Sequence, residues 1–145
     1  MSALVERMKL PFPTDATETG PIIEYRNSSV SVKYDNLDSK EAKWVSLAFR
    51  DVLAYEVCES ICCSVETVIP SDVIEARKES AWLTQIVGRW KELVGWQQFQ
   101  QELGGEKRFK HYVIDFDDVC AVQVIAAVCT VRSDENKKPS EQSTL

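Results

Sequence analysis

The strongest hydrophobic pattern in the chain runs from Phe109 to Val131. Two apolar runs rich in β-branched residues flank a break at Asp117–Asp118, and this pattern predicts two antiparallel strands joined by a tight turn. The second run is apolar at nearly every position, so we expect a central strand that is covered on both faces. In the first run, alternation assigns side chains to opposite faces, with Tyr112, Ile114 and Phe116 on one and His111, Val113, Asp115 and Asp117 on the other.

Two further stretches alternate with the same period of two. Ile22–Arg26 and Ser29–Asp35 are separated by Asn27–Ser28, which predicts a hairpin. The stretch Lys43–Val57 also alternates, but its phase slips at Arg50–Asp51. A bulge or corner at that point would keep the apolar residues of both halves on the core side, so we expect one bent strand or two short ones.

A helix is predicted to follow a short strand at Val73–Arg77. Ser80 can cap the helix at its N-terminus, and the helical pattern extends to Leu103, before Gly104–Gly105. Gly95 either allows close approach of another backbone within one long helix or marks a break in it. The apolar residues that recur at helical spacing are Trp82, Leu83, Ile86, Val87, Trp90, Leu93 and Val94.

Strands followed by a helix and a closing hairpin predict an α+β fold, a mostly antiparallel sheet of about six strands with one long helix packed on one face. The length of 145 residues fits one domain, which we assign to residues 21–132. Residues 1–20 contain Pro11 and Pro13 with little periodicity and are predicted to form an N-terminal arm. Residues 133–145 offer nothing to bury and are predicted to be a disordered tail.

The charge balance limits the classes of partner. The chain has 23 acidic and 17 basic residues, a formal charge of −6, which argues against nucleic acid and is compatible with a basic protein partner. No apolar run reaches the roughly 20 residues that a membrane span needs, and the N-terminus shows no secretory signal, so we expect no membrane association. Five cysteines are an odd number for a disulfide scaffold, which favours reduced thiols and a cytoplasmic location.

Two clusters of residues could carry chemistry. Asp115 and Asp117, with His111, could hold a hard cation or act as a base with an orienting carboxylate. A solvated sheet face that ends in an Asp-Asp turn explains the same residues, and we favour this interpretation. The single histidine excludes zinc sites built from two or three histidines.

The second cluster is the cysteine group Cys58, Cys62 and Cys63. It lacks the second pair of cysteines that structural zinc sites use, and no basic residue lies nearby in the sequence to lower a thiol pKa. We interpret these cysteines as structural and expect neither metal nor cofactor. Phosphate-binding loops, nucleophile elbows and dinucleotide-binding motifs are absent from the sequence as well, so an enzyme is not the favoured prediction.

Tryptophan is the more informative residue type, because four occur in this chain. Most of those in the helical pattern fit a core stripe. An outward-facing tryptophan would instead be a binding hot spot, since tryptophan, tyrosine and arginine dominate protein interfaces. Trp44 and Trp96 are the two candidates.

An acidic, single-domain α+β chain with many aromatic residues and no catalytic set resembles the small bacterial immunity proteins of the contact-dependent growth inhibition type. The resemblance implies a protein that binds and occludes a cognate toxin domain, often a basic nuclease. It also implies that carboxylates pair with basic toxin residues, the candidates being Asp115, Asp117, Asp118, Glu24 and Asp35. Two alternatives are a metal- or thiol-dependent enzyme that uses the clusters above and a scaffold domain that assembles with itself through a sheet edge or the helix.

Overall fold

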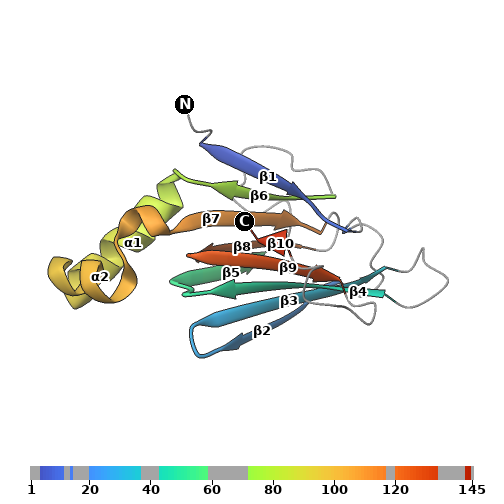
Figure 1. The fold of residues 1–145 in the computed structure, drawn as a ribbon, viewed down its shortest axis with the longest axis horizontal. Helices are drawn as coiled ribbons and strands as arrows, with labels where there is room; N and C mark the ends of the chain where they lie inside the picture. The colour runs from blue at the N-terminus through green and yellow to red at the C-terminus, as the bar shows by residue number, and fades with distance from the viewer. Residues whose placement is uncertain are drawn as a thin grey trace.

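The computed structural model describes residues 4–11, 14, 20–36, 43–58, 72–116, 120–133 and 143–144. These residues form two antiparallel β-sheets and two α-helices (Figure 1). The predicted α+β class is therefore confirmed. The single sheet of about six strands and the single long helix are wrong, because the strands divide between two sheets and the helix breaks.

Each sheet has a simple antiparallel order. Sheet A consists of β1 (Val5–Lys9), β6 (Val73–Arg77), β7 (Lys110–Asp115), β8 (Ala121–Ala126) and β5 (Ala54–Cys58), in that order. Sheet B consists of the two-residue β10 (Ser143–Thr144), then β9 (Val128–Ser133), β4 (Lys43–Arg50), β3 (Ser29–Asn36) and β2 (Ile22–Arg26). In Figure 1 both orders run from top to bottom, so β5 and β2 form the lower edges of the two sheets.

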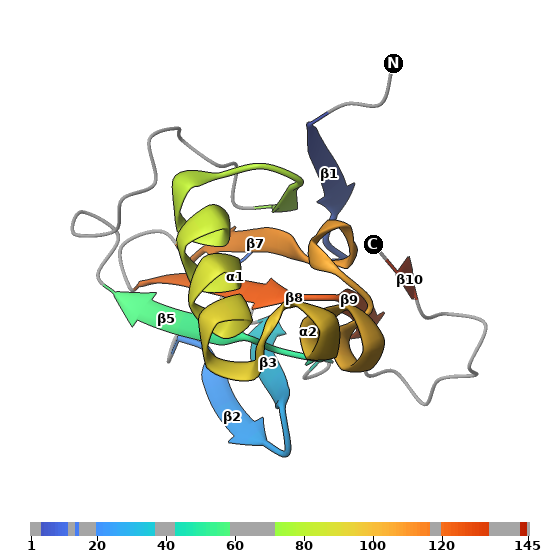
Figure 2. The ribbon, with the colours of Figure 1, turned by 90° about the vertical axis from the view of Figure 1, so that its left-hand side faces the viewer.

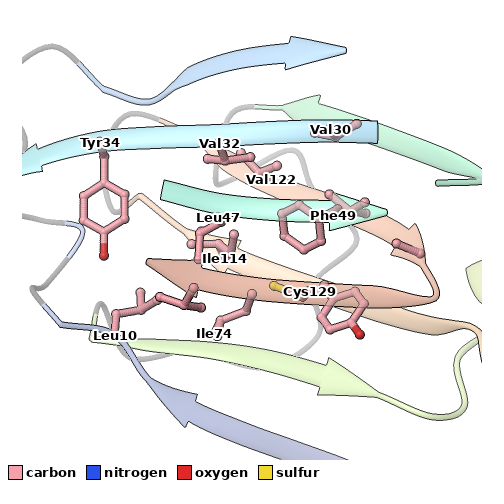
Figure 3. Packing of buried hydrophobic residues seen from close by; sticks show 14 of the residues in the cluster. Leu10, Val30, Val32, Tyr34, Leu47, Phe49, Ile74, Ile114, Val122 and Cys129 are labelled. Carbon is pink, nitrogen blue, oxygen red and sulfur yellow. The ribbon is translucent and has the colours of Figure 1, made fainter. Parts of the chain in front are cut away.

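The main core lies between the two sheets. Val32 and Leu47 of sheet B and Ile114 of sheet A are fully buried there (Figure 3). Two edge-to-face ring pairs cross the interface, Tyr34–Phe116 with centroids 5.4 Å apart and Phe49–Tyr112 with centroids 5.3 Å apart. The predicted grouping of Tyr112, Ile114 and Phe116 on one strand face is thus confirmed, and the structure shows that this face points into the core. Such aromatic pairs contribute about 0.5–1.5 kcal/mol beyond their buried area.

Two of the connections between the sheets, β4 to β5 and β8 to β9, lie at adjacent corners. At the first, Asp51 adopts a φ of +54° between β4 and β5, as the phase slip at Arg50–Asp51 predicted. At the second, Ala127 separates β8 from β9, and its N–H donates to the Arg50 carbonyl oxygen over 3.1 Å. The predicted single strand after Asp118 is therefore two strands of different sheets. No polar or turn-forming residue at Ala127 marked this corner in the sequence.

The helices cover one part of the outer face of sheet A (Figure 2). Helix α1 (Ala81–Val94) begins where the Ser80 hydroxyl accepts a hydrogen bond from the Leu83 N–H, 3.0 Å away, which confirms the predicted cap. Gly95, with a φ of +86°, ends α1, and α2 (Trp96–Leu103) follows. Leu83, Val87 and Phe99 pack here against Phe109 and Ile125. None of the helices in the described ranges has the length and apolarity to cross a bilayer.

The predictions for the N-terminal arm and the C-terminal tail have different outcomes. Residues 5–9 of the predicted arm form strand β1, which pairs with β6, and Leu10 is buried, so the arm prediction is wrong for this segment. The sequence hid the strand because three of its five residues are charged. Of the predicted disordered tail, Ser133 ends β9 and Ser143–Thr144 pair with it. Residues 134–142 and 145 lie outside the described residues.

Candidate functional site

His111 is the residue with the greatest catalytic potential in the sequence, and it lies on the outer face of sheet A beneath α1, 3% exposed. Its Nδ1 is 2.8 Å from Ser80 Oγ and its Nε2 is 2.7 Å from Gln123 Oε1. The neutral ring with its proton on Nε2 fits both partners, because Nε2–H can donate to Gln123 while the Ser80 hydroxyl donates to Nδ1. The ring also meets Trp82 edge-to-face, with centroids 5.1 Å apart.

Burial lowers the pKa of His111 from 6.5 to about 4. The positive charge of Arg77 contributes to this lowering, while the hydrogen bond to Gln123 and the charge of Glu75 oppose it. His111 is therefore uncharged at neutral pH, and both ring nitrogens have partners inside the protein. This geometry offers no proton acceptor to a substrate. It ties the N-terminus of α1 to sheet A.

Glu75 lies beside this histidine and is the one acidic side chain among the buried residues of the described part. Its two carboxylate oxygens are engaged by different arginines, Arg77 Nε at 2.6 Å and Arg7 Nε at 3.2 Å. No buried side-chain nitrogen or oxygen of the described residues lacks a hydrogen-bond partner. A saturated network of this kind holds elements in place, because removal of any partner leaves a buried polar group without compensation.

An open groove of about 1030 Å³ runs along the flank of α1. Its floor includes Leu83 and Val87, and Lys91 and Glu106 form an ion pair of 2.7 Å at its rim. Neither His111 nor a described cysteine lines the groove. The groove therefore contains hydrophobic and surface-charged side chains but no group with the environment of a catalytic acid, base or nucleophile.

The cysteines do not form an accessible thiol cluster in the described part of the chain. Cys58 is disulfide-bonded, which corrects the prediction of reduced thiols at this position, whereas Cys62 and Cys63 lie outside the described residues. Cys120 and Cys129 are free and buried, and burial raises the pKa of both thiols. Neither is a thiolate at neutral pH. Among the described residues, no group of three or more histidine, cysteine, aspartate or glutamate side chains is placed to hold a metal ion.

Asp115 lies at the end of β7, on the outer face of sheet A. It is partly buried, and its backbone oxygen accepts a hydrogen bond of 2.5 Å from the Thr14 hydroxyl. Asp117 and Asp118 lie outside the described residues, so the geometry of the predicted acidic cluster is not established. His111 lies on the same face of β7 but is buried, so it is not accessible to solvent beside Asp115.

The other predicted contact residues fall on two further surfaces. Glu24, Asp35 and Trp44 share the outer face of sheet B, where Asp35 is directly opposite Trp44 in the β3–β4 register and Trp44 is half-buried. Trp96 lies at the start of α2 and is exposed. The residues predicted as partner contacts are thus distributed over both outer faces and the helical region.

The outer face of sheet B is not acidic. Glu24 and Asp35 share it with four exposed cations, Arg26, Lys33, Arg50 and Arg132. The sequence explains the difference, because 11 of the 23 acidic residues but only 3 of the 17 basic ones lie outside the described residues. The described part of the chain has 12 acidic and 14 basic residues. The acidic surplus that indicated a basic partner therefore belongs to the other segments.

The helix junction carries the most exposed large apolar side chains among the described residues. Leu93, near the end of α1, is 79% exposed, and Trp96, at the start of α2, is 61% exposed. The backbone between them is fixed, since the Gly95 N–H donates to the Lys91 carbonyl oxygen over 2.8 Å. Phe99 is fully buried and anchors α2. We call Leu93 and Trp96 the helical tip.

A second exposed apolar surface lies where β2 and β5 run along the lower edges of the two sheets. The rings of Tyr25 and Tyr55 stack there with centroids 5.7 Å apart and an angle of 17° between their planes. The two side chains are 55% and 43% exposed, and Val57 beside them is 45% exposed. The rings, together with Trp90, line a pocket of about 260 Å³. We call these three exposed residues, Tyr25, Tyr55 and Val57, together with the half-buried Ile23 of β2, the tyrosine seam.

The sequence analysis identified Trp96 but not the tyrosine seam. Tyr25 and Tyr55 belong to alternating strands, where an aromatic residue is typical of a core face. Only their position on edge strands of different sheets leaves them exposed, and alternation does not reveal which strands are edges. Comparison of this chain with protein-family models, with curated proteins and with solved structures gives no match.

Proposed function

We propose that this chain is a non-catalytic protein-binding domain that contacts its partner through the helical tip, Leu93 and Trp96. The observation that carries the proposal is the exposure of these two large apolar side chains on a fixed backbone. A tryptophan presented in this way gains a large contact area at little cost in conformational entropy, which is why tryptophan dominates interface hot spots.

The interior of the molecule supports a binding role over a catalytic one. His111 is buried, uncharged at neutral pH and hydrogen-bonded on both nitrogens, and the free thiols of Cys120 and Cys129 are buried. The buried groups with perturbed pKa values thus serve the packing of α1 and the two sheets. We therefore assign the recognition of a partner to exposed side chains.

The specific form that we propose is the inhibition of a bacterial toxin by occlusion, because the chain resembles small immunity proteins in its overall character. The carboxylates closest in sequence to the helical tip are Glu92 and Glu102, both exposed. They would lie at the rim of the contact and face basic residues of the toxin. Rim charges of this kind mainly raise the association rate and select the partner.

The test begins with capture of the partner from a lysate of the source organism, followed by calorimetric measurement of its affinity. Trp96→Ala should weaken binding by about 2–4 kcal/mol, at least roughly 30-fold, and Leu93→Ala by more than about 1 kcal/mol. Leu4→Ala is the matched control, since Leu4 is 55% exposed but precedes β1, and it should leave affinity unchanged.

A toxicity assay then tests the specific form. The captured partner should arrest growth when expressed alone, and co-expression of this chain should restore growth, whereas the Trp96→Ala chain should not. Unchanged affinity of the Trp96→Ala and Leu93→Ala variants would contradict the helical tip as the contact. A partner without toxicity would contradict the inhibitor role while leaving the binding surface in place.

A further inference from the structure

The tyrosine seam lies on two sheet edges that are both unpaired among the described residues. Strand β5 ends the order of sheet A and β2 ends that of sheet B (Figure 1). Their facing rings, Tyr25 and Tyr55, are in contact across the gap between the sheets. Edge strands of natural proteins are usually protected by lysine, proline or a bulge. Neither β2 nor β5 contains lysine or proline.

The backbone of each strand also directs unpaired groups outwards at the seam. In β2, the two-residue turn at Asn27–Ser28 makes Arg26 and Ser29 the closing pair of the hairpin. Hydrogen-bonding direction alternates along an antiparallel strand, so the N–H and C=O groups of Ile23 and Tyr25 point away from β3.

The same reasoning applies to β5. The Phe116 N–H donates to the Cys120 carbonyl oxygen, and the β7–β8 register then directs the odd-numbered residues of β8 towards β5. Their partners in β5 are the even-numbered residues, as Glu56 opposite Gln123 shows. The N–H and C=O groups of Tyr55 and Val57 therefore point to the outer edge. All four seam residues combine an apolar side chain with outward-directed backbone groups.

We propose that a second copy of this chain pairs with the first along both edges at once, about a twofold axis through Tyr25 and Tyr55. A symmetric dimer uses the same patch on both subunits, so an antiparallel self-pair places one residue of the strand opposite itself. A centre at Glu24 or Glu56 would place like charges directly opposite each other, which is destabilising. A twofold axis placed at Tyr25 or Tyr55 avoids this repulsion.

Charge complementarity selects the centre at Tyr25. In that register, Glu24 is opposite Arg26 of the second copy, and symmetry gives the reverse pair as well. Both side chains are exposed, and no ion pair within the described residues engages either of them. On β5, the corresponding centre at Tyr55 places Ala54 opposite Glu56, where the small side chain leaves room for the carboxylate.

The two registers are compatible because Tyr25 is stacked on Tyr55. A twofold axis perpendicular to the sheets that passes through one ring passes close to the other. The dimer would bury the four tyrosine rings at its centre and continue each sheet into its copy. This inference goes beyond the proposed function, since Leu93 and Trp96 take no part in the strand pairing, and the two can fail independently.

Sedimentation equilibrium of the full chain tests the dimer. The wild-type mass should rise with concentration towards twice the 16.5 kDa of one chain. Arg26→Glu and Glu24→Arg should each weaken dimerisation by about tenfold or more, because each replaces two attractive pairs by two repulsive ones. The double variant with both exchanges restores opposite charges and should return the dissociation constant to near the wild-type value.

Lys33→Glu is the matched control, because Lys33 is an exposed cation on β3 that does not belong to an edge. Its dissociation constant should equal that of the wild type. A monomeric mass at every concentration would overturn the inference. So would a double variant that remains as weak as the single variants, since it would show that Glu24 and Arg26 do not meet across a twofold axis.

Discussion

The two edge strands of sheet A differ in how they meet solvent. Strand β1 has the sequence Val-Glu-Arg-Met-Lys, and its charged side chains Glu6 and Arg7 form ion pairs with residues of neighbouring elements. Strand β5 has the sequence Ala-Tyr-Glu-Val-Cys and exposes Tyr55 and Val57. Charges on an edge strand oppose the addition of another strand, whereas an apolar edge favours it. One edge of the same sheet is closed to association and the other is open.

This difference shows how the described part of the chain divides its charged and apolar groups. Near β1, ionic and polar side chains satisfy one another, as Glu75 does with Arg7 and Arg77, and they fix α1 above the sheet through His111. The seam and the helical tip instead present apolar side chains to solvent. Large exposed apolar surfaces mark sites of association. The charged region therefore provides the rigid frame from which the apolar surfaces act.

The largest expected effect concerns the charged region. Glu75→Gln removes the charge between Arg7 and Arg77 and should lower the free energy of unfolding by about 3–5 kcal/mol, because it leaves cationic groups without their buried partner. Urea denaturation measures this change. Glu6→Gln is the control, since the Glu6 side chain is 36% exposed and its pairs with Lys78 and Lys110 should together contribute at most about 1 kcal/mol. Equal losses for the two variants would contradict the distinction between a buried network and a surface pair.

The next effect is the dependence of stability on pH through His111. Its pKa is about 4 in the folded protein, compared with 6.5 for the unperturbed side chain, so the unfolded state binds more protons between these values. The contribution of the uncharged His111 to the free energy of unfolding is fully present above pH 6.5 and is lost as pH falls towards 4. The loss amounts to about 3 kcal/mol, since each unit of pKa difference corresponds to roughly 1.4 kcal/mol.

Chemical denaturation across this pH range, with the wild type and His111→Gln compared, isolates the contribution. Carboxylates titrate mainly below pH 5 in both proteins, so the window between pH 5 and 6.5 is the informative one. The wild type should lose stability there as pH falls, and the variant should show a nearly flat profile. A parallel slope in both proteins would exclude His111 as the source.

Alternation of residues predicted most of the strands and which side chains share a face, because side-chain direction along a strand is a local property. That Tyr112 and Ile114 lie on the same face followed from period two alone. The division into two sheets did not follow from this alternation, because no local sequence signal marks the corner at Ala127, which depends on pairing with distant strands. Strand β1 was missed because three of its five residues are charged and because its pairing with β6 joins residues about 70 positions apart, as Val5 with Arg77.

The functional surfaces were predictable only in part. Trp44 and Trp96 were candidates because an outward-facing tryptophan would be a binding hot spot, and of the two Trp96 is exposed whereas Trp44 is half-buried. The sequence offered Glu24 and Asp35 as alternatives to Asp115 but did not reveal that they lie on opposite outer faces of the two sheets. The stack of Tyr25 on Tyr55 joins residues 30 positions apart in different sheets and arises only when both sheets are packed. Position in a folded sheet, and not residue type, made these side chains accessible.

Residue-resolved amide hydrogen exchange at low and high protein concentration tests the contrast between the two edges most directly. The N–H groups of Tyr25, Tyr55 and Val57 point to the open edges, and those of Arg7 and Lys9 point to the outer edge of β1, whose inner hydrogen bonds begin at Leu4 and end at Leu10. The account predicts that the first group exchanges more slowly at high concentration while the second group is unchanged. Exchange that is independent of concentration at Tyr25 and Tyr55, or protection that appears at Arg7 instead, would contradict it.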